Sequence, residues 1–571
     1  MKKSYIVFVA FHIACLLVSG TNLHAQTVPP GQEAGPQAQR LREDIERRKA
    51  IFEEKKAGPA PWVPEEAAQP AMLSKVFLLR NIKITGMTLF TSDQLRPLYQ
   101  PLLGKEVVLA DIQNIADSVK ARYKAKGYLT TMAFIPEQEI KDGAVEISVM
   151  EGKMGDLKVE GNRWVRADII RGYFHTQKND LLNIPRLESD ILRMNQDPDL
   201  EVRARLMEGA APQTSDITLT TRDRYPYHIG MGVDNQGTRL AGKEREMFTL
   251  RSTNITGHDD DGFASFMLGK SSHAQSVNYR YPLDTNGTRI GLSLSHYNLK
   301  LAKEFKEFDM TGDTKVMSPY ISKGLFLSGD AQVDFNTGLD IMSVKKHHSG
   351  QLSANDQLRV PYLGMDFTKI DPLGQTTFSP RADFGLSGLM GASSEDHPSA
   401  SRRGTGGRFF KYGQTITRSQ QMFCDSYAVI RGQIQATADA LAPSEQLQIG
   451  GVNSVRGYPE GDYLADKGMI LNIDWIFPMY VFPPAWRLPH ADMPLRHQIE
   501  PVIFFDWGEG RLNRVLPGES RAKTLAGVGG GVRMRLYKNL FARFEWAKDI
   551  GDKPVSGAGP ATFIFSVQSE L

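Results

Sequence analysis

Residues 447–463 read LQIGGVNSVRGYPEGDY, and residues 504–508 read FFDWG. In the first run, four glycines and Pro459 surround Arg456 and Tyr458, a composition that neither a regular strand nor a helix tolerates. Glycine permits positive φ and close backbone approach, so this run predicts a tightly folded loop that presents Arg456. The second run places the carboxylate of Asp506 in an otherwise apolar and aromatic strand.

A contact between the two runs follows from the cost of burying charge. Burying either side chain alone is expensive, whereas a hydrogen-bonded pair of opposite charges is tolerated. We therefore predict that Arg456 reaches Asp506. A glycine-rich surface turn and an unrelated strand carboxylate would explain either run alone, but the two runs together favour the pair.

Residues 224–571 are typical of a membrane barrel. In MILNIDWIFPMY, Leu471, Ile473 and Trp475 lie on one face and Asn472 and Asp474 on the other. A soluble sandwich also alternates, but charges on one face and large aromatics on the other favour a lipid-facing antiparallel β-barrel with a hydrated lumen. At about 10 residues per strand plus turns, the length fits roughly 16 strands. The polar parity of the last strands carries Arg533, Arg535, Arg543 and Glu545.

The parity of FFDWG agrees with the predicted contact. Asp506 shares the parity of Glu500 and points inward, whereas Phe505 and Trp507 point at lipid. Phe504 also falls on the inward parity, so the inner wall is not uniformly polar.

Two tandem α+β units precede the predicted barrel. Residues 76–153 show the order β-α-α-β-β, with a turn signal at Asp142-Gly143, and residues 154–223 repeat that order. Two unrelated small domains, or another β-α-α-β-β adaptor, would be the alternatives. Such units have an open sheet edge that suits capture of an extended peptide by strand addition.

The N-terminal residues divide into three segments. Residues 1–25 combine Lys2-Lys3, an apolar run and a small-residue site at Ala25, and they predict a signal peptide. Residues 26–57 predict a flexible stretch to residue 38 and then a charge-dense helix over 39–56, which a solvated spacer would also explain. Residues 58–75 predict a linker.

Composition and motifs exclude several classes of function. The formal net charge of +3 over 571 residues gives no argument for nucleic acid as a partner. No P-loop, G-x-S-x-G or H-E-x-x-H motif occurs, and Cys424 is the only cysteine after the signal segment, so we expect no enzyme, cofactor, metal or disulfide. Residues 259–262 (DDDG) predict a solvated hairpin tip rather than a calcium loop.

The two runs resemble a known signature. VRGY, which is Val455, Arg456, Gly457 and Tyr458, and F-x-D-x-G, which contributes Phe504, Asp506 and Gly508, are similar to the paired motif of two-partner secretion transporters (TpsB; hemolysin secretion/activation) of the POTRA-barrel outer-membrane superfamily. In that family a loop folds into the barrel and its arginine meets an inward aspartate. The resemblance implies that the tandem units are periplasmic POTRA domains and that the 39–56 helix plugs the lumen.

The resemblance also implies function and partners. It predicts a transporter that recognises the N-terminal secretion domain of a large TpsA-like exoprotein and passes the exoprotein through the barrel without nucleotide hydrolysis. Outer-membrane lipid and the barrel-assembly machinery are the other implied partners, although Leu571 replaces the usual terminal aromatic residue. An assembly insertase of the same superfamily and a passive porin are the alternatives. We expect residues 391–421 and 483–497 to be extracellular loops.

Overall fold

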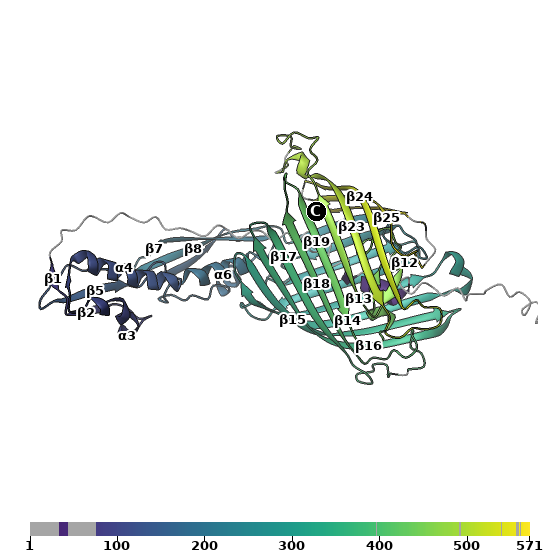
Figure 1. Cartoon of the computed structure of the whole chain (residues 1–571), viewed down its shortest axis with the longest axis horizontal. Helices are drawn as coiled ribbons and strands as arrows, with labels where there is room; N and C mark the ends of the chain where they lie inside the picture. The colour runs from purple at the N-terminus through teal and green to yellow at the C-terminus, as the bar shows by residue number, and fades with distance from the viewer. Residues whose placement is uncertain are drawn as a thin grey trace, which may run out of the picture.

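The computed structural model describes residues 33–40, 42–43, 76–395, 397–489, 491, 493–537, 539–555, 559 and 561–571. The predicted signal peptide (1–25) and linker (58–75), and most of the predicted helix over 39–56, lie outside these residues. In Figure 1 two elongated α+β units extend from one end of a wide, tilted barrel. No helix in the described part of the chain is long and apolar enough to cross a bilayer.

The first α+β unit is a three-stranded sheet covered by helices. Its longest helix, α4 (Leu109–Ala125), turns Ile112, Ile115, Val119 and Tyr123 into the core, as the spacing of apolar residues predicts. The sheet order is β2-β5-β4, with β2 parallel to β5 and β4 antiparallel to it. The remaining elements are β1 (Phe77–Leu78), β2 (Asn81–Thr85), α3 (Ser92–Leu95), η2 (Arg96–Leu98), η3 (Gln100–Leu102), β3 (Glu106–Val107), β4 (Met132–Phe134) and β5 (Ala144–Met150).

A buried carboxylate, Glu151, ties this unit together. It is 2% exposed and accepts hydrogen bonds from Tyr123 Oη at 2.6 Å, Thr88 Oγ1 at 2.5 Å and the backbone N–H groups of Thr88 and Leu89 at 2.7 and 2.9 Å. Burial by itself would raise the pKa of Glu151, but these hydrogen bonds outweigh it and lower that pKa below its ordinary value.

We expect Glu151→Gln to destabilise the first unit by about 2–3 kcal/mol, because an amide places N–H groups against donors that now face a carboxylate. Since the folded-state pKa is lowered, the contribution of Glu151 is present above the unfolded pKa of about 4.3 and is lost as the pH falls. Hydrogen exchange over residues 77–152 of the full chain measures the effect. Glu139→Gln, which alters an exposed carboxylate, is the control and should leave exchange unchanged.

The second unit repeats the first. Its sheet order β6-β8-β7 again places the last strand in the centre, parallel to the first strand, so the predicted β-α-α-β-β repeat is present. The N–H of Ile184 donates to Gly127 O at 2.9 Å and joins the two units. The elements are β6 (Lys153–Glu160), α5 (Ala167–Gly172), α6 (Ile184–Met194), β7 (Leu200–Glu208) and β8 (Thr214–Asp223).

The second unit docks through polar contacts on the turns at its own end of the barrel. Tyr173 Oη donates to Asp259, and Arg289 Nη2 donates to the same carboxylate at 2.5 Å. Arg193 Nη1 donates to Asn286 O in the next turn at 2.8 Å. The residues 259–262 therefore do not form a solvated tip as predicted. Asp259 and Asp260 are buried because the turn lies against the second unit.

Sixteen antiparallel strands form a closed barrel, in agreement with the prediction. The barrel closes where β26 pairs with β9 and where the N–H of Leu571 donates to Ile229 O at 2.8 Å. The strands are β9 (Tyr227–Asp234), β10 (Arg245–Ser252), β11 (Asp261–Gly269), β12 (Ser272–Pro282), β13 (Thr288–Lys300), β14 (Thr311–Leu327), β15 (Ala331–His348), β16 (Gln351–Asp371), β17 (Gly374–Gly385), β18 (Phe409–Gln421), β19 (Tyr427–Ala436), β22 (Lys467–Ile476), β23 (Ile499–Arg511), β24 (Ala522–Leu536), β25 (Leu540–Asp549) and β26 (Ala561–Glu570).

The direction and the extent of the strands correct the two loop predictions. Because the chain enters β9 from the second α+β unit, counting strands places residues 437–466 at the far end and residues 477–498 at the end that carries the units. The predicted extracellular loop over 483–497 is therefore a periplasmic turn. The loop predicted over 391–421 ends at residue 408, since Phe409–Gln421 forms strand β18.

A short helical stretch lies inside the barrel. Residues 34–40 and 42–43 are helical, so the helix begins within the stretch predicted to be flexible. Ala34 and Ala38 pack on Tyr297 and Leu299 of β13 and on Leu240 of the β9–β10 loop. A Cβ at Gly312 would lie 2.4 Å from the Cβ of Ala34, so this glycine gives the helix room against β14.

Candidate functional site: the inward loop and its ion-pair cluster

The loop between β19 and β22 folds into the lumen instead of extending outward. It contains the short strands β20 (Leu447–Ile449) and β21 (Tyr463–Ala465), which pair with each other and pack near β23. Gly450, Gly451, Gly457 and Gly461 all have positive φ, which explains the density of glycine in this run. Apolar residues of the loop and of the barrel wall pack together in one buried cluster. Its members are Leu447, Ile449, Val455, Tyr458, Tyr463, Ala465, Ile470, Leu512 and Leu525.

Arg456 lies against Asp506 with nearly all its surface buried. The two residues are 2% and 0% exposed. Arg456 Nε donates to Asp506 Oδ2 at 2.6 Å, Nη2 donates to Oδ1 at 2.7 Å, and the Arg456 backbone N–H donates to Oδ2 at 3.0 Å. Asn472 Nδ2 adds a hydrogen bond to Oδ1 at 2.8 Å. This two-pronged contact is the geometry in which a guanidinium binds a carboxylate most strongly.

Two further carboxylates share the guanidinium. Arg456 Nη2 donates to Asp474 Oδ1 at 2.5 Å, and Nη1 donates to Glu545 Oε2 at 3.2 Å. Arg533 Nη2 in turn donates to Asp474 at 2.7 Å and lies 2.8 Å from Glu545. Arg543 Nη2 donates to Glu545 Oε2 at 2.5 Å. Three arginines and three carboxylates thus form a charge-balanced cluster, which makes its burial tolerable.

The other predicted site residues shape the place where the loop docks. The ring centroid of Phe504 lies 3.5 Å from Arg456 Cζ, a cation–π contact. Gly508 leaves room for Val455, because a Cβ at Gly508 would lie 3.0 Å from Val455 Cγ2. Tyr458 Oη donates to Asp552 O at 2.9 Å, which fastens the loop to the neighbouring extracellular turn. Gly457 has a φ of 97°.

The sequence analysis did not assign four members of the cluster: Asp474, Arg533, Arg543 and Glu545. Their inward parity was recognised, so the signal was present. Their mutual proximity depends on the pairing of β22 to β25, which places Asn472 opposite Asp506 and Arg533 opposite Arg543. A single sequence does not contain that register.

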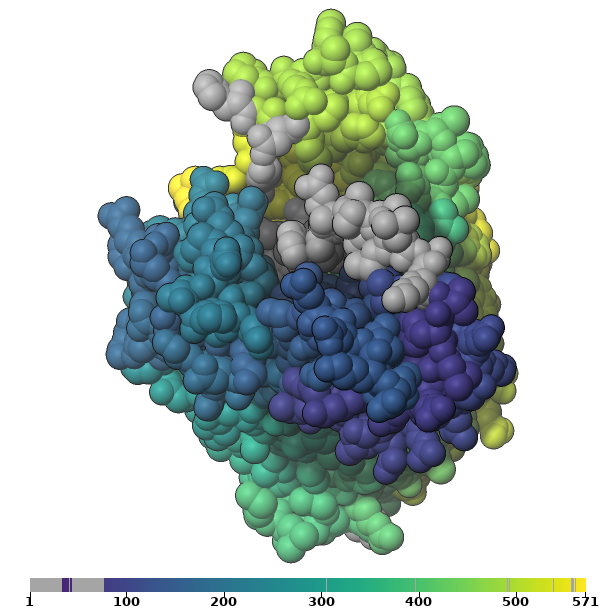
Figure 2. Space-filling view, turned by 90° about the vertical axis from the view of Figure 1, so that its left-hand side faces the viewer, coloured from purple at the N-terminus to yellow at the C-terminus, as the bar shows by residue number. Residues whose placement is uncertain are grey.

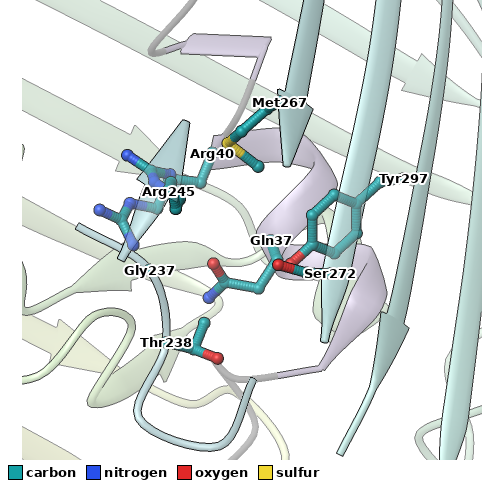
Figure 3. Close-up of a pocket in the computed structure, with 8 residues that line it drawn as sticks. All are labelled: Gln37, Arg40, Gly237, Thr238, Arg245, Met267, Ser272 and Tyr297. Carbon is teal, nitrogen blue, oxygen red and sulfur yellow. The ribbon is translucent and has the colours of Figure 1, made fainter. Parts of the chain in front are cut away.

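The helical residues 34–40 contact the back of the same loop. Arg40 forms an ion pair with Glu460, and both side chains are about nine-tenths buried. Gln448 Nε2 donates to Pro36 O. Lys346 pairs with Glu33, and Arg42 Nη2 lies 3.3 Å from Asp340 on β15. Figure 3 shows a small pocket between this helix and the barrel wall, lined by Gln37, Arg40, Gly237, Thr238, Arg245, Met267, Ser272 and Tyr297.

Together, a closed membrane-type barrel, tandem POTRA-like units at one end and a loop pinned inside the lumen define the class of POTRA-barrel proteins. The family models agree with this class. The model described as POTRA domain, ShlB-type, matches residues 77–152, and the model described as haemolysin secretion/activation protein ShlB/FhaC/HecB matches residues 213–534. The chain belongs to the ShlB/FhaC/HecB family of haemolysin secretion/activation proteins.

Similar proteins carry related names. The outer membrane transporter CdiB of Dickeya dadantii is 24% identical over 466 residues, which cover 79% of this chain and 80% of the relative. The heme/hemopexin transporter protein HuxB of Haemophilus influenzae is 21% identical over 455 residues, with 78% of each chain covered. The solved structure of CdiB from Escherichia coli has the same fold, with a TM-score of 0.73, 20% identity and coverage of 94% of this chain and 98% of that one.

Proposed function

We infer that this chain is an outer-membrane transporter of two-partner secretion, which recognises a large exoprotein in the periplasm through its POTRA domains and secretes it through the barrel. Its family membership, and the relatives named as transporters, support this assignment. The observation that carries it is the combination of tandem POTRA units and a lumen loop held by Arg456 in one closed barrel.

Exoprotein capture is proposed to use the sheet edges of the POTRA units. Strand β4 lies at one edge of the first sheet, and strand β7 lies at one edge of the second. Met132, Phe134 and Met207 on these strands are exposed. An extended segment of the exoprotein's N-terminal secretion domain would add to such an edge, with backbone hydrogen bonds for affinity and side-chain contacts for specificity.

The helical residues 34–40 are proposed to belong to a plug, within the segment 26–57. Their contacts with Glu460 and Gln448 fasten them to the loop that carries Arg456. The plug must leave before a polypeptide passes. The four residues of VRGY and the three of F-x-D-x-G are proposed to keep the loop docked on β23 while the plug moves.

Other aspects of the proposal concern energy and biogenesis. We propose that the protein has no catalytic activity. The direction of transport would then be supplied by folding of the exoprotein outside the cell. Leu571 is 78% exposed and shares the parity of Phe563 and Phe565. We therefore propose that it takes the place of the terminal aromatic residue presented to the barrel-assembly machinery. The predicted signal peptide over 1–25 would direct export.

The alternatives explain less of the molecule. A passive porin needs neither the POTRA units nor the ion-pair cluster. An assembly insertase of the same superfamily would share the architecture, so the fold alone does not separate it from a secretion transporter. The family model favours the secretion transporter over both.

Co-expression of this chain and its exoprotein in a bacterial host tests the proposal. We expect this chain, expressed with a large exoprotein encoded beside its gene, to release that exoprotein into the medium. Deletion of residues 77–152, which removes the first POTRA unit, should trap the exoprotein in the periplasm while the barrel still resists heat denaturation on gels. Release at the parental level by the deletion variant would contradict recognition through the POTRA domains.

A further inference from the structure

The periplasmic turn between β22 and β23 is unusually long. It covers residues 477–498, which read FPMYVFPPAWRLPHADMPLRHQ, and the structure describes all of it except residues 490 and 492. The next longest periplasmic turn covers only residues 253–260. Figure 1 shows this yellow-green segment standing out from the side of the barrel near β19 and β23, away from the axis along which the POTRA units extend.

Contacts hold this turn in a defined shape. Tyr480 Oη donates to Cys424 O in the neighbouring turn, and Arg496 Nη2 donates to Asp425 Oδ2 at 2.8 Å. Within the turn, the N–H of Leu495 donates to Trp486 O at 2.7 Å. These contacts give the turn a defined conformation, in which its side chains have fixed positions.

Several large apolar side chains are exposed on this projection. Val481 is 83% exposed, Trp486 is 57% exposed and Tyr480 is 54% exposed. Phe482 stacks on Trp486 with ring centroids 6.2 Å apart, and Phe423 in the adjacent turn is 63% exposed. A contiguous apolar and aromatic patch of this kind marks a surface that contacts something other than water.

The patch continues the lipid-facing wall of the barrel. Trp475, on the lipid-facing parity of β22, contacts Phe477 with ring centroids 4.8 Å apart and Phe423 with centroids 5.5 Å apart. Trp and Tyr are enriched where a membrane protein meets the headgroup layer.

We propose that residues 477–498 form an interfacial anchor, in which Tyr480, Val481 and Trp486 insert into the periplasmic leaflet of the outer membrane. Apolar surfaces that lie in the membrane interface insert about 5–10 Å, to the boundary between headgroups and acyl chains. Because the turn joins β22 to β23, it fixes the membrane depth of the two strands that carry Asp474 and Asp506. Figure 2, which looks onto the periplasmic face, shows the projection at the rim, beyond the POTRA units.

The exoprotein, instead of lipid, is the other partner that this apolar patch could bind. The position of the patch favours lipid, because it faces sideways from the wall and continues the apolar outer face of the barrel. A surface for the exoprotein would be expected along the path from the POTRA units to the lumen.

A site-specific fluorescence experiment tests the anchor. The full mature chain with Cys424→Ser and Val481→Cys is labelled with an environment-sensitive dye and placed in vesicles of phosphatidylethanolamine and phosphatidylglycerol. A nitroxide attached near the headgroup end of a lipid acyl chain should quench this label several-fold more strongly than a soluble nitroxide does. The matched control is Ala211→Cys in the exposed β7–β8 turn of the second POTRA unit, where the soluble nitroxide should be the stronger quencher.

Two results would overturn the proposal. One is equal access of the soluble nitroxide to the labels at positions 481 and 211. The other is protection of the label at position 481 only when exoprotein is added, which would assign the patch to that partner. Trp486 gives an independent reading that needs no cysteine: brominated lipid should quench the parent more than the Trp486→Phe variant, and equal quenching would contradict insertion. Heat modifiability of the barrel on gels confirms folding of each variant.

Discussion

Secretion by the Arg456→Ala variant is expected to fall to background while the barrel remains in the outer membrane. Removing one partner of a buried ion pair costs about 3–5 kcal/mol, because the remaining charge keeps its desolvation penalty. Here Asp506, which is fully buried, would keep only Asn472 and the residue 456 backbone as donors. A loss of that size lowers the docked population of the loop by about 10²–10⁴-fold. The barrel survives because its strand pairing does not involve this side chain.

The measurement is exoprotein in the medium at matched surface levels of the transporter. Arg418→Ala is a suitable control, since Arg418 also pairs with a barrel carboxylate, Asp371, but lies outside the loop and is partly exposed. It should secrete normally. Arg456→Lys should remain strongly impaired, because one ammonium cannot replace a guanidinium that contacts three carboxylates. Secretion by Arg456→Ala equal to that of the parent would refute a role for the pair.

A backbone change reaches the same loop without altering charge. A Cβ at Gly527 on β24 would lie 1.9 Å from Arg456 O, so Gly527→Ala should displace the loop and lower secretion in the same direction. At Gly413 on β18 a Cβ meets no atom within 4 Å, so Gly413→Ala should behave as the parent. If both alanine variants secreted equally, close docking of the loop on β24 would not matter for transport.

The sequence predicted the features that depend on local pattern. Alternation over residues 224–571 indicated the barrel, and glycine density around Arg456 indicated the inward loop. The approach of Arg456 to Asp506 followed from the cost of isolated charge. The longest strands, β14, β15 and β16, have 17, 18 and 21 residues, far more than a bilayer requires, and no simple periodicity separates their membrane part from their extension.

The features that were missed depend on strand pairing and on which side of the membrane a segment lies. Prediction of the full ion-pair cluster required the register of four strands. Inward parity places Glu545 on the inner face of the barrel but does not say which residues lie beside it. The turn over 483–497 was placed on the wrong side because polarity does not encode sidedness. Only an accurate strand count does, and an assignment of residues 409–421 to a loop removes one strand from that count.

Reversal of one charge on the proposed plug, Arg40→Glu, is expected to raise the ion conductance of the barrel in planar bilayers. Arg40 and Glu460 are both buried, so the variant sets two carboxylates against each other where an ion pair now joins the helix to the loop. The plugged state should become about 100-fold less populated relative to the open state. Deletion of residues 39–56, which removes both Arg40 and Arg42, should raise the conductance as well.

The compensating variant decides whether the pair itself holds the plug. Arg40→Glu combined with Glu460→Arg rebuilds an ion pair of inverted polarity, so its conductance should return towards that of the parent, a non-additivity that general damage to the barrel would not produce. Arg408→Glu is the matched control, because Arg408 forms a largely exposed pair with Glu395, and surface pairs contribute little. Its conductance should equal the parent's. If Arg40→Glu also conducted like the parent, the contact between Arg40 and Glu460 would not keep the helix in the lumen, since loss of a retaining contact must increase the open population.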